Sequence, residues 1–229
     1  MCGIVGFVNY KKELPNKKNV MNTMTQTLSN RGPDEEDLYL NNNVALGHKR
    51  LIVIDPQGGK QPMIQRFNQG EYVIVYNGQI YNTKELRKTL TENGFTFYGH
   101  CDTEILLKSY IHYGKDVVNH LNGIFSFAIW NTKTQELFMA RDHFGVKPLF
   151  YTMQNNSFIF ASEITALLEH PDIPHVIDVH SAAELILMAP GRTPGCGVVK
   201  DVCEVKPGWC GFYSKDGLKL WEYWRLRAY

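Results

Sequence analysis

The sequence predicts an α+β fold in which two sheets pack against each other and helices cover the outside. Strand-like runs come in clusters with helical runs between them, which is not the strict alternation of parallel βαβ units. The runs at 72–78 and 124–131 are apolar throughout, as expected of strands covered on both faces. With 229 residues, 44% of them apolar, the chain can bury a substantial core in one large domain, with or without an appendage.

The first part of the chain predicts a strand, a helix, two strands and a long loop: 3–9, 16–30, 36–42, 44–54 and 55–63. The helix places Val20, Met21, Met24 and Leu28 at helical spacing. The Gly and Pro of the following RGPD stretch end it, because both residues disrupt helices. The loop is rich in Gly, Gln and Pro.

The middle of the chain predicts a buried strand followed by two helices: 72–78, 82–94 and 102–114. The strand ends in Asn77-Gly78, which is a strong turn signal. Asn82 is a suitable N-cap for the first helix, and Gly94 lies beyond its end.

The remainder predicts four strands, a short helix and a further helical stretch, before Pro/Gly-rich sequence and late strands: 124–131, 136–142, 149–153, 158–162, 163–170 and 181–189.

Composition argues against several functional classes. The net charge is +1 and no Lys/Arg cluster stands out, so nucleic acid and anionic membranes are poor candidate partners. The longest compact apolar stretch, 124–130, is far shorter than the ~20 residues of a spanning helix. No basic region precedes the apolar N-terminus, as a signal peptide would require, so a cytoplasmic setting is expected.

The five cysteines favour free thiols over a metal site or a disulfide framework. Cys196, Cys203 and Cys210 are seven residues apart, whereas zinc sites use closer pairs. We expect buried thiols in strands and no metal.

The opening MCGIVGF raises the question of what Cys2 does. It could be a small apolar residue at the start of a strand. Alternatively, its small side chain permits removal of Met1, which would leave Cys2 with a thiol and a free α-amine. That amine has a pKa of about 7.7–8.0 and is therefore a usable general base beside the nucleophile.

The stretch YNGQIYN offers two hydrogen-bond donors. Asn77 has a side-chain N–H, and Gly78 has a backbone N–H with no side chain to block close approach. Two donors aimed at one point make an oxyanion hole, although an isolated Asn-Gly is more often only a hairpin turn.

Ten stretches in order carry a specific resemblance: MCGIVGF, RGPD, GHKRLIVID, QPM, YNGQIYN, CDTEILL, LNGIFSFAIWN, ARDHFGVKPLFY, FASEITALL and YW. Together they resemble the class II glutamine amidotransferase domain of N-terminal-nucleophile hydrolases, most closely the glutaminase domain of glutamine-dependent asparagine synthetases. The resemblance runs from residue 1 to about 224. It implies a four-layer αββα sandwich that hydrolyses glutamine to glutamate and ammonia.

The resemblance also implies roles for individual residues. Cys2 attacks the side-chain amide of glutamine and its amine moves protons, while Asn77 and Gly78 hold the oxyanion. Arg50 binds the α-carboxylate and Asp102 pairs with the α-ammonium, although alone they could be a solvated charge and a helix cap. The remaining substrate-binding residues are Leu51, Ile52, Val53, Ile54 and Gln79.

Three further positions qualify this assignment. Arg31 could support the nucleophile or be purely structural. Gln79 stands where the family motif usually has a carboxylate, NGEIYN, which bears on ammonium recognition. Asn30 stands where His is common. No histidine is assigned to catalysis.

The resemblance predicts an amidotransferase domain at 2–190, with terminal strands and the start of a linker at 191–229. The partner is a covalently linked synthetase domain, because no Ser-Gly-Gly-x-Asp-Ser ATP loop occurs here; ATP and Mg would belong to that domain, and none is expected in this one. A homodimer is possible. The alternatives are the amidotransferase domain of another class II enzyme, or a non-catalytic regulatory module with the same fold.

Overall fold

The computed structural model describes residues 1–11, 14–188 and 191–227. Within them, one sheet contains β1 (Gly3–Asn9), β2 (Glu35–Leu40), β3 (Val44–Arg50), β8 (Phe150–Gln154), β9 (Ser157–Ala161) and β10 (Val202–Glu204). The other contains β4 (Met63–Phe67), β5 (Gly70–Ile80), β6 (Gly123–Asn131), β7 (Glu136–Arg141), β11 (Trp209–Ser214) and β12 (Gly217–Glu222). The helices are α1 (Lys17–Gln26), α2 (Thr83–Glu92), α3 (Asp102–Tyr113), α4 (Ile164–Leu168), α5 (Val179–Leu187) and the 3-10 helix η1 (Gly114–Asn119).

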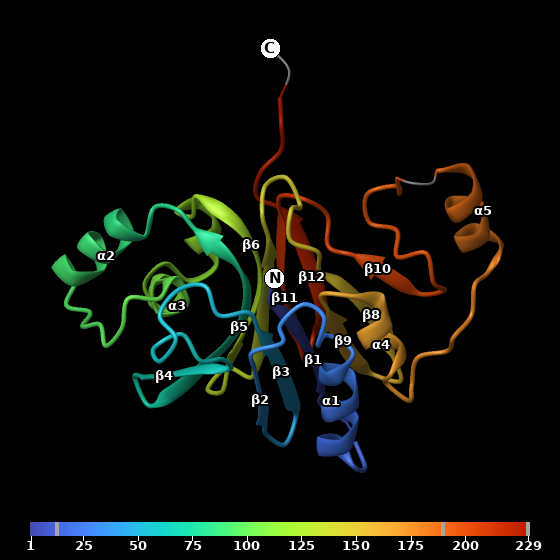
Figure 1. The fold of residues 1–229 in the computed structure, drawn as a ribbon, viewed down its shortest axis with the longest axis horizontal. Helices are drawn as coiled ribbons and strands as arrows, with labels where there is room; N and C mark the ends of the chain where they lie inside the picture. The colour runs from blue at the N-terminus through green and yellow to red at the C-terminus, as the bar shows by residue number, and fades with distance from the viewer. Residues whose placement is uncertain (12–13, 189–190, 228–229) are drawn as a thin grey trace.

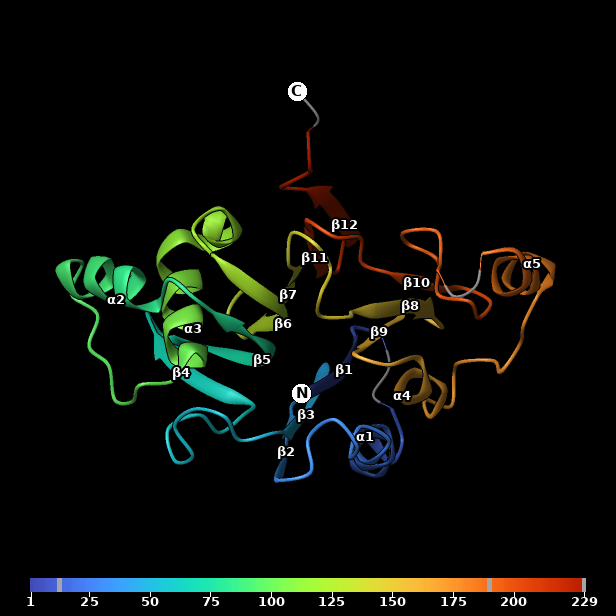
Figure 2. The ribbon, with the colours of Figure 1, turned by 45° about the horizontal axis from the view of Figure 1, so that its top comes forward.

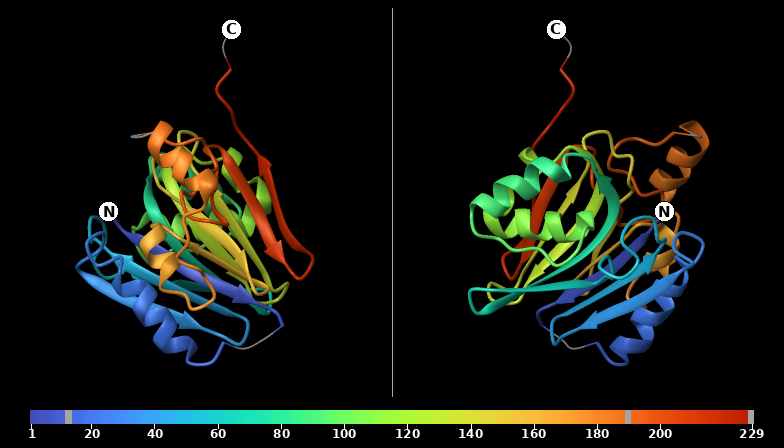
Figure 3. Two further views of the ribbon diagram at one scale, coloured as in Figure 1. Left: turned by 90° about the vertical axis from the view of Figure 1, so that its right-hand side faces the viewer. Right: turned by 60° about the vertical axis from the view of Figure 1, so that its left-hand side comes forward.

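Both sheets are antiparallel. The strand orders are β10-β8-β9-β1-β3-β2 and β12-β11-β7-β6-β5-β4. In Figure 1 the helices α2 and α3 lie on one side of the paired sheets, and α1 and α4 lie on the other. The right-hand view of Figure 3 shows α2 and α3 across the face of the sheet that contains β5. The layers are therefore helix, sheet, sheet and helix, and the predicted αββα sandwich is confirmed.

Side-chain alternation along the strands builds the layers. On β1, Ile4 and Val8 pack between the sheets, whereas Val5 and Phe7 pack against α1 and α4. On β6, Ala128 and Trp130 face the other sheet, while Phe125, Phe127 and Ile129 pack under α2 and α3. This period of two is the geometry of a strand covered on both faces, as the apolar runs predicted.

One expectation in the middle of the chain is wrong, and one strand was not predicted. Asn77-Gly78 is not a turn: it lies inside β5, opposite Ser126 and Phe125 of β6. The unpredicted strand is β4, which begins at the last residue of the expected loop and forms a hairpin with β5. That hairpin turns at Asn68 and Gln69, with φ of 47° and 61°, and a glutamine is a weak sequence signal for this left-handed conformation.

The ends of three elements differ from the prediction. β3 stops at Arg50, so 51–54 are not strand, and α1 stops at Gln26, after which the chain continues as turns. α5 begins at Val179, where Asp178 caps it; residue 189 of the predicted stretch 181–189 lies outside the described residues.

Asn82 occupies the predicted N-cap position of α2, but its side chain does not cap the helix. Instead, its amide donates to His120 O and its side-chain oxygen accepts from Asn122 N.

The late strands join both sheets. β10 pairs with β8, and β11 pairs with β7 and β12. Figure 2 shows α5 at the opposite end of the molecule from α2 and α3. None of the helices described is both long enough and apolar enough to cross a lipid bilayer.

Candidate active site

The predicted site residues converge on one cavity of ≈ 180 Å³. It lies where the start of β1, the segment after β3, the C-terminal part of β5 and the start of α3 meet. All but one of the predicted residues line it: Cys2, Arg50, Leu51, Val53, Ile54, Asn77, Gly78, Gln79 and Asp102. Its other walls come from Met1, Gly59, Gln61, Tyr76, Cys101, Thr103, Ile124 and Lys147.

Cys2 precedes β1 and turns its thiol toward the segment after β3. The Sγ accepts a hydrogen bond from Leu51 N at 3.4 Å and lies 3.6 Å from Leu51 O. Burial raises the pKa of the Cys2 thiol, while the Leu51 N–H, the terminal amine and Arg50 counteract part of that rise. The backbone N–H is therefore a ready partner for a thiolate.

The RGPD stretch contacts the backbone of Cys2 and the end of β3. Arg31 Nε donates to Cys2 O at 2.9 Å, and its NH1 pairs with Glu163 at 3.1 Å. A Cβ on Gly32 would lie 2.3 Å from the carbonyl carbon of Lys49, so only glycine fits against the end of β3. Arg31 thus supports the backbone of Cys2 and does not line the cavity.

Asn77 lies on the face of β5 that turns toward the first sheet, in the same alternation as Val73 and Val75. The residue is 1% exposed, and its Nδ2 has no hydrogen-bond partner among the described residues. An unpaired buried amide is costly, so this N–H is available for a ligand in the cavity.

Gly78 follows Asn77 in the same strand. A Cβ at this position would lie 2.3 Å from Ile124 O, so a side chain is excluded by the pairing with β6. Gln79 is next; it is exposed and borders the cavity.

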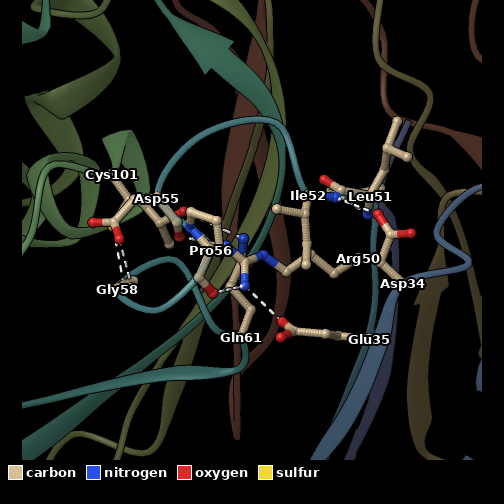
Figure 4. Close-up of polar contacts among 12 residues, drawn as sticks. Asp34, Glu35, Arg50, Leu51, Ile52, Asp55, Pro56, Gly58, Gln61 and Cys101 are labelled. Atoms are coloured by element: carbon tan, nitrogen blue, oxygen red, sulfur yellow. Dashed lines mark hydrogen bonds and ion pairs between the residues drawn. The ribbon is translucent and has the colours of Figure 1, made fainter.

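Arg50, the last residue of β3, holds the loop that follows it (Figure 4). Its NH1 pairs with Glu35 at 2.6 Å and donates to Pro56 O at 2.8 Å, and its NH2 donates to Asp55 O at 2.7 Å. The loop closes further because Asp55 accepts N–H groups from Gly58 and His100. Arg50 is buried, borders the cavity and already has protein acceptors on both terminal nitrogens.

Ile52 differs from its predicted neighbours. Leu51, Val53 and Ile54 line the cavity, but Ile52 does not. Its backbone N–H donates to Asp34 Oδ2 at 2.7 Å, which ties the loop to the RGPD stretch (Figure 4).

Asp102 is the first residue of α3 and reaches back to β5. Its Oδ2 accepts Tyr76 Oη at 2.7 Å and Ile80 N at 3.1 Å. Burial raises the pKa of the Asp102 carboxyl, and these hydrogen bonds limit the rise. The carboxylate is thus held rigidly in the wall of the cavity.

Three of the cavity residues that sequence reasoning did not assign, Gln61, Tyr76 and Lys147, bear on the chemistry of the site. Gln61 Oε1 accepts Tyr76 N at 2.6 Å, and Tyr76 orients Asp102. Lys147 lines the cavity from the segment between β7 and β8. The signals were present in QPM, YNG and GVKPL, but residue type alone did not say that these motifs meet.

Histidines and cysteines elsewhere have other surroundings. Burial lowers the pKa of His48 to about 4, so this ring is neutral near pH 7. All five cysteines are free. Among the described residues, one group has metal-ligating atoms within 4.8 Å of one another, namely His180, Glu184 and Cys196, and none of these residues lines the cavity. The Glu184 carboxylate already accepts the Thr193 N–H.

Comparisons with known proteins match nearly the whole chain to one family of domains. A family model described as "Glutamine amidotransferase domain" matches residues 1–224. The chain is 48% identical over 228 residues to asparagine synthetase (glutamine-hydrolyzing) 3 of Bacillus subtilis, and 39% identical over 170 residues to asparagine synthetase (glutamine-hydrolyzing) 1 of the same organism. The matches cover 100% and 73% of this chain but only 37% and 27% of those relatives.

Among solved structures, the fold is similar to a glutamine phosphoribosylpyrophosphate amidotransferase from B. subtilis, with a TM-score of 0.70 at 20% identity. That match covers 97% of this chain and 49% of the other.

Proposed function

The chain belongs to the glutamine amidotransferase domain family, and on that premise we propose that its cavity hydrolyses L-glutamine to glutamate and ammonia. Cys2 is the nucleophile. The ammonia supplies a glutamine-dependent asparagine synthetase, of which this chain is the glutaminase part.

One observation carries this proposal. The Cys2 thiol, just before β1 of the first sheet, and the Asn77 amide, on β5 of the second sheet and without a partner in the described part of the chain, border the same cavity. Acyl transfer needs a thiol nucleophile and a preorganised N–H donor. Within the described residues, neither group forms an ion pair or a hydrogen bond to another side chain.

The reaction begins after Met1 is removed. The α-amine of Cys2 accepts the thiol proton, and Sγ attacks the amide carbon of glutamine. The carbonyl oxygen becomes an oxyanion held by Asn77 Nδ2 and the Gly78 N–H. The amine returns its proton to the departing nitrogen, which leaves as ammonia. A water, activated by the same amine, then attacks the thioester, releasing glutamate and the free thiol.

Substrate binding uses the charges at the other end of the cavity. Asp102, fixed by Tyr76, pairs with the α-ammonium. The α-carboxylate binds Arg50 in exchange for loop carbonyls such as Asp55 O, because a charged acceptor makes a stronger hydrogen bond to guanidinium than a neutral carbonyl. Leu51, Val53 and Ile54 enclose the methylenes.

Replacing Arg50 should weaken glutamine binding more than turnover. We expect Arg50→Lys to raise KM by roughly 10- to 100-fold, since a fork of charge-assisted hydrogen bonds worth about 1.5–3 kcal/mol is lost, with a smaller effect on kcat. Steady-state kinetics measures both constants. Glu35→Gln is the matched control: it removes the carboxylate that competes for the same guanidinium and should not raise KM. A fall in kcat alone for Arg50→Lys would contradict the assignment.

Gln79→Glu should lower KM. The exposed rim position would give the substrate ammonium a second carboxylate, worth about 1 kcal/mol or about fivefold in KM. The reacting amide is at the other end of glutamine, so kcat should not change. Gln79→Ala is the control for loss of the amide. An unchanged KM for Gln79→Glu would show that this side chain does not contact the substrate.

The acceptor chemistry belongs to a longer protein. The chain spans about two fifths or less of the lengths of the curated relatives described above, whose names denote asparagine synthetases. We propose that a covalently linked synthetase domain, with ATP and Mg, consumes the ammonia, and that the amidotransferase part needs no cofactor of its own.

An assay of both reaction products tests the proposed function. Protein whose intact mass shows complete loss of Met1 is incubated with L-glutamine, and glutamate and ammonia are measured separately. Equal release of both products, with none from D-glutamine, is expected. Absence of both products from fully processed, folded protein would contradict the proposal.

A further inference from the structure

Lys147 is held in the cavity wall by two buried side chains. Its backbone N–H donates to Asp142 Oδ2 at 2.9 Å, and its carbonyl accepts Arg141 Nε at 2.9 Å. Asp142 also accepts the backbone N–H groups of Phe144 and Val146, so the whole segment wraps around one carboxylate. The backbone of Lys147 is therefore fixed by Arg141 and Asp142, although the sequence analysis did not assign this residue to the site.

The ammonium of Lys147 lacks an ordinary partner. The residue is 9% exposed, and the one hydrogen bond that its Nζ makes within the described residues goes to Met1 Sδ, at 3.3 Å. A thioether is a weak acceptor. No carboxylate oxygen of the described residues lies within ion-pair distance of this Nζ, and a buried ammonium without a partner is costly. A purely structural role does not account for it.

The other charged groups near Lys147 have partners, whereas its own ammonium forms no ion pair within the described residues. Arg31 is paired with Glu163, Asp142 is occupied by backbone N–H groups, and Arg50 is paired with Glu35. The remaining groups that titrate around Cys2 are its own thiol, Tyr76 and Asp102, and the last two bond to each other. Burial and Arg31 lower the pKa of the Lys147 amine, while Asp142 and Cys2 oppose this shift.

Removal of Met1 changes what Lys147 faces. The thioether leaves with the methionine, and the nitrogen that was an amide becomes the α-amine of Cys2. We propose that Lys147 is a positioning residue whose positive charge then keeps this α-amine in its neutral, proton-accepting form. The inference rests on the proposed function, because it concerns the base of that reaction.

The sign of the effect follows from like charges. A nearby ammonium disfavours a second ammonium, so the α-amine pKa falls below its usual value of about 7.7–8.0. The acid limb of the kcat/KM profile reports the free base, so in the unmodified enzyme its midpoint should lie below that range. Without the charge at 147, the midpoint should move up by about one pH unit, which lowers kcat/KM about tenfold at the acid end. The alkaline plateau and KM should stay unchanged.

The test is the pH profile of kcat/KM for processed enzyme between about pH 6 and pH 9, which brackets this amine. Lys147→Met should shift the acid limb upward, and Lys147→Arg, which keeps the charge, should restore it. Lys60→Met, which removes an exposed charge near the cavity, is the control and should leave the profile unmoved.

Three results would overturn the inference: an equal loss at every pH, a change in KM alone, or an unshifted limb. If Lys147→Met does not fold, the unmodified enzyme still decides, because an acid-limb midpoint at or above the usual range contradicts the inference. Complete inactivity of the unmodified, processed enzyme would instead contradict the proposed function.

Discussion

Cys2→Ala should abolish glutamine hydrolysis while leaving the fold intact. Within the described residues, Cys2 is the thiol that contacts the Leu51 N–H, and the hydrogen bonds of its Sγ go to Leu51, in the segment after β3, and not to β1. Cys2→Ser should be nearly as inactive, because a hydroxyl is much harder to deprotonate than a thiol. Glutamate release measures activity, and thermal unfolding checks that both variants are folded.

Cys101 provides the matched control, because it is the second thiol in the cavity wall. Its Sγ contacts Gly58 O at 3.3 Å and burial raises its pKa, so it is a packed thiol beside α3. Cys101→Ala should keep glutaminase activity. If Cys101→Ala were inactive and Cys2→Ala active, the nucleophile would have been assigned to the wrong cysteine.

Asn77→Ala should lower kcat by roughly 10²–10³, the usual cost of one oxyanion donor, with little change in KM. The amide is already buried and unpartnered, so removing it costs the folded protein no hydrogen bond within the described residues. The effect should therefore appear in turnover and not in stability. Steady-state kinetics together with thermal unfolding separates the two.

Ser126 is the control for Asn77. It lies opposite Asn77 on β6, is equally buried and also has an unpartnered side chain within the described residues, but it does not line the cavity. Ser126→Ala should leave kcat unchanged. A rise in KM without a fall in kcat for Asn77→Ala would mean that this amide binds the ground state only.

Ordered motifs predicted much of the site because each motif is local. Three short motifs, MCG, YNG and CDT, contain Cys2, Asn77 and Asp102. These residues lie just before β1, within β5 and at the start of α3, and the fold brings them to one cavity. The layers were predictable too, since the apolar runs at β5 and β6 require cover on both faces.

The partners of those residues were not predictable, because they are long-range. Arg31 pairs with Glu163, which is 132 positions away in the sequence. The guanidinium of Arg50 forms an ion pair with Glu35 and hydrogen bonds with loop carbonyls. Asn77-Gly78 was interpreted as a turn because local propensity favours one, yet pairing with β6 keeps it in the strand. Lys147 was missed because its placement depends on two buried side chains, Arg141 and Asp142, that have no periodic signature.

The most direct measurement is covalent labelling with a glutamine analogue that carries an electrophilic carbon in place of the side-chain amide. Peptide mapping after labelling of processed protein should find one adduct per chain, on Cys2, and excess L-glutamine should suppress it. Protein that retains Met1 should label slowly, because its Cys2 nitrogen is an amide without a basic lone pair. Labelling of Cys101 in place of Cys2, or labelling that L-glutamine does not suppress, would contradict the account.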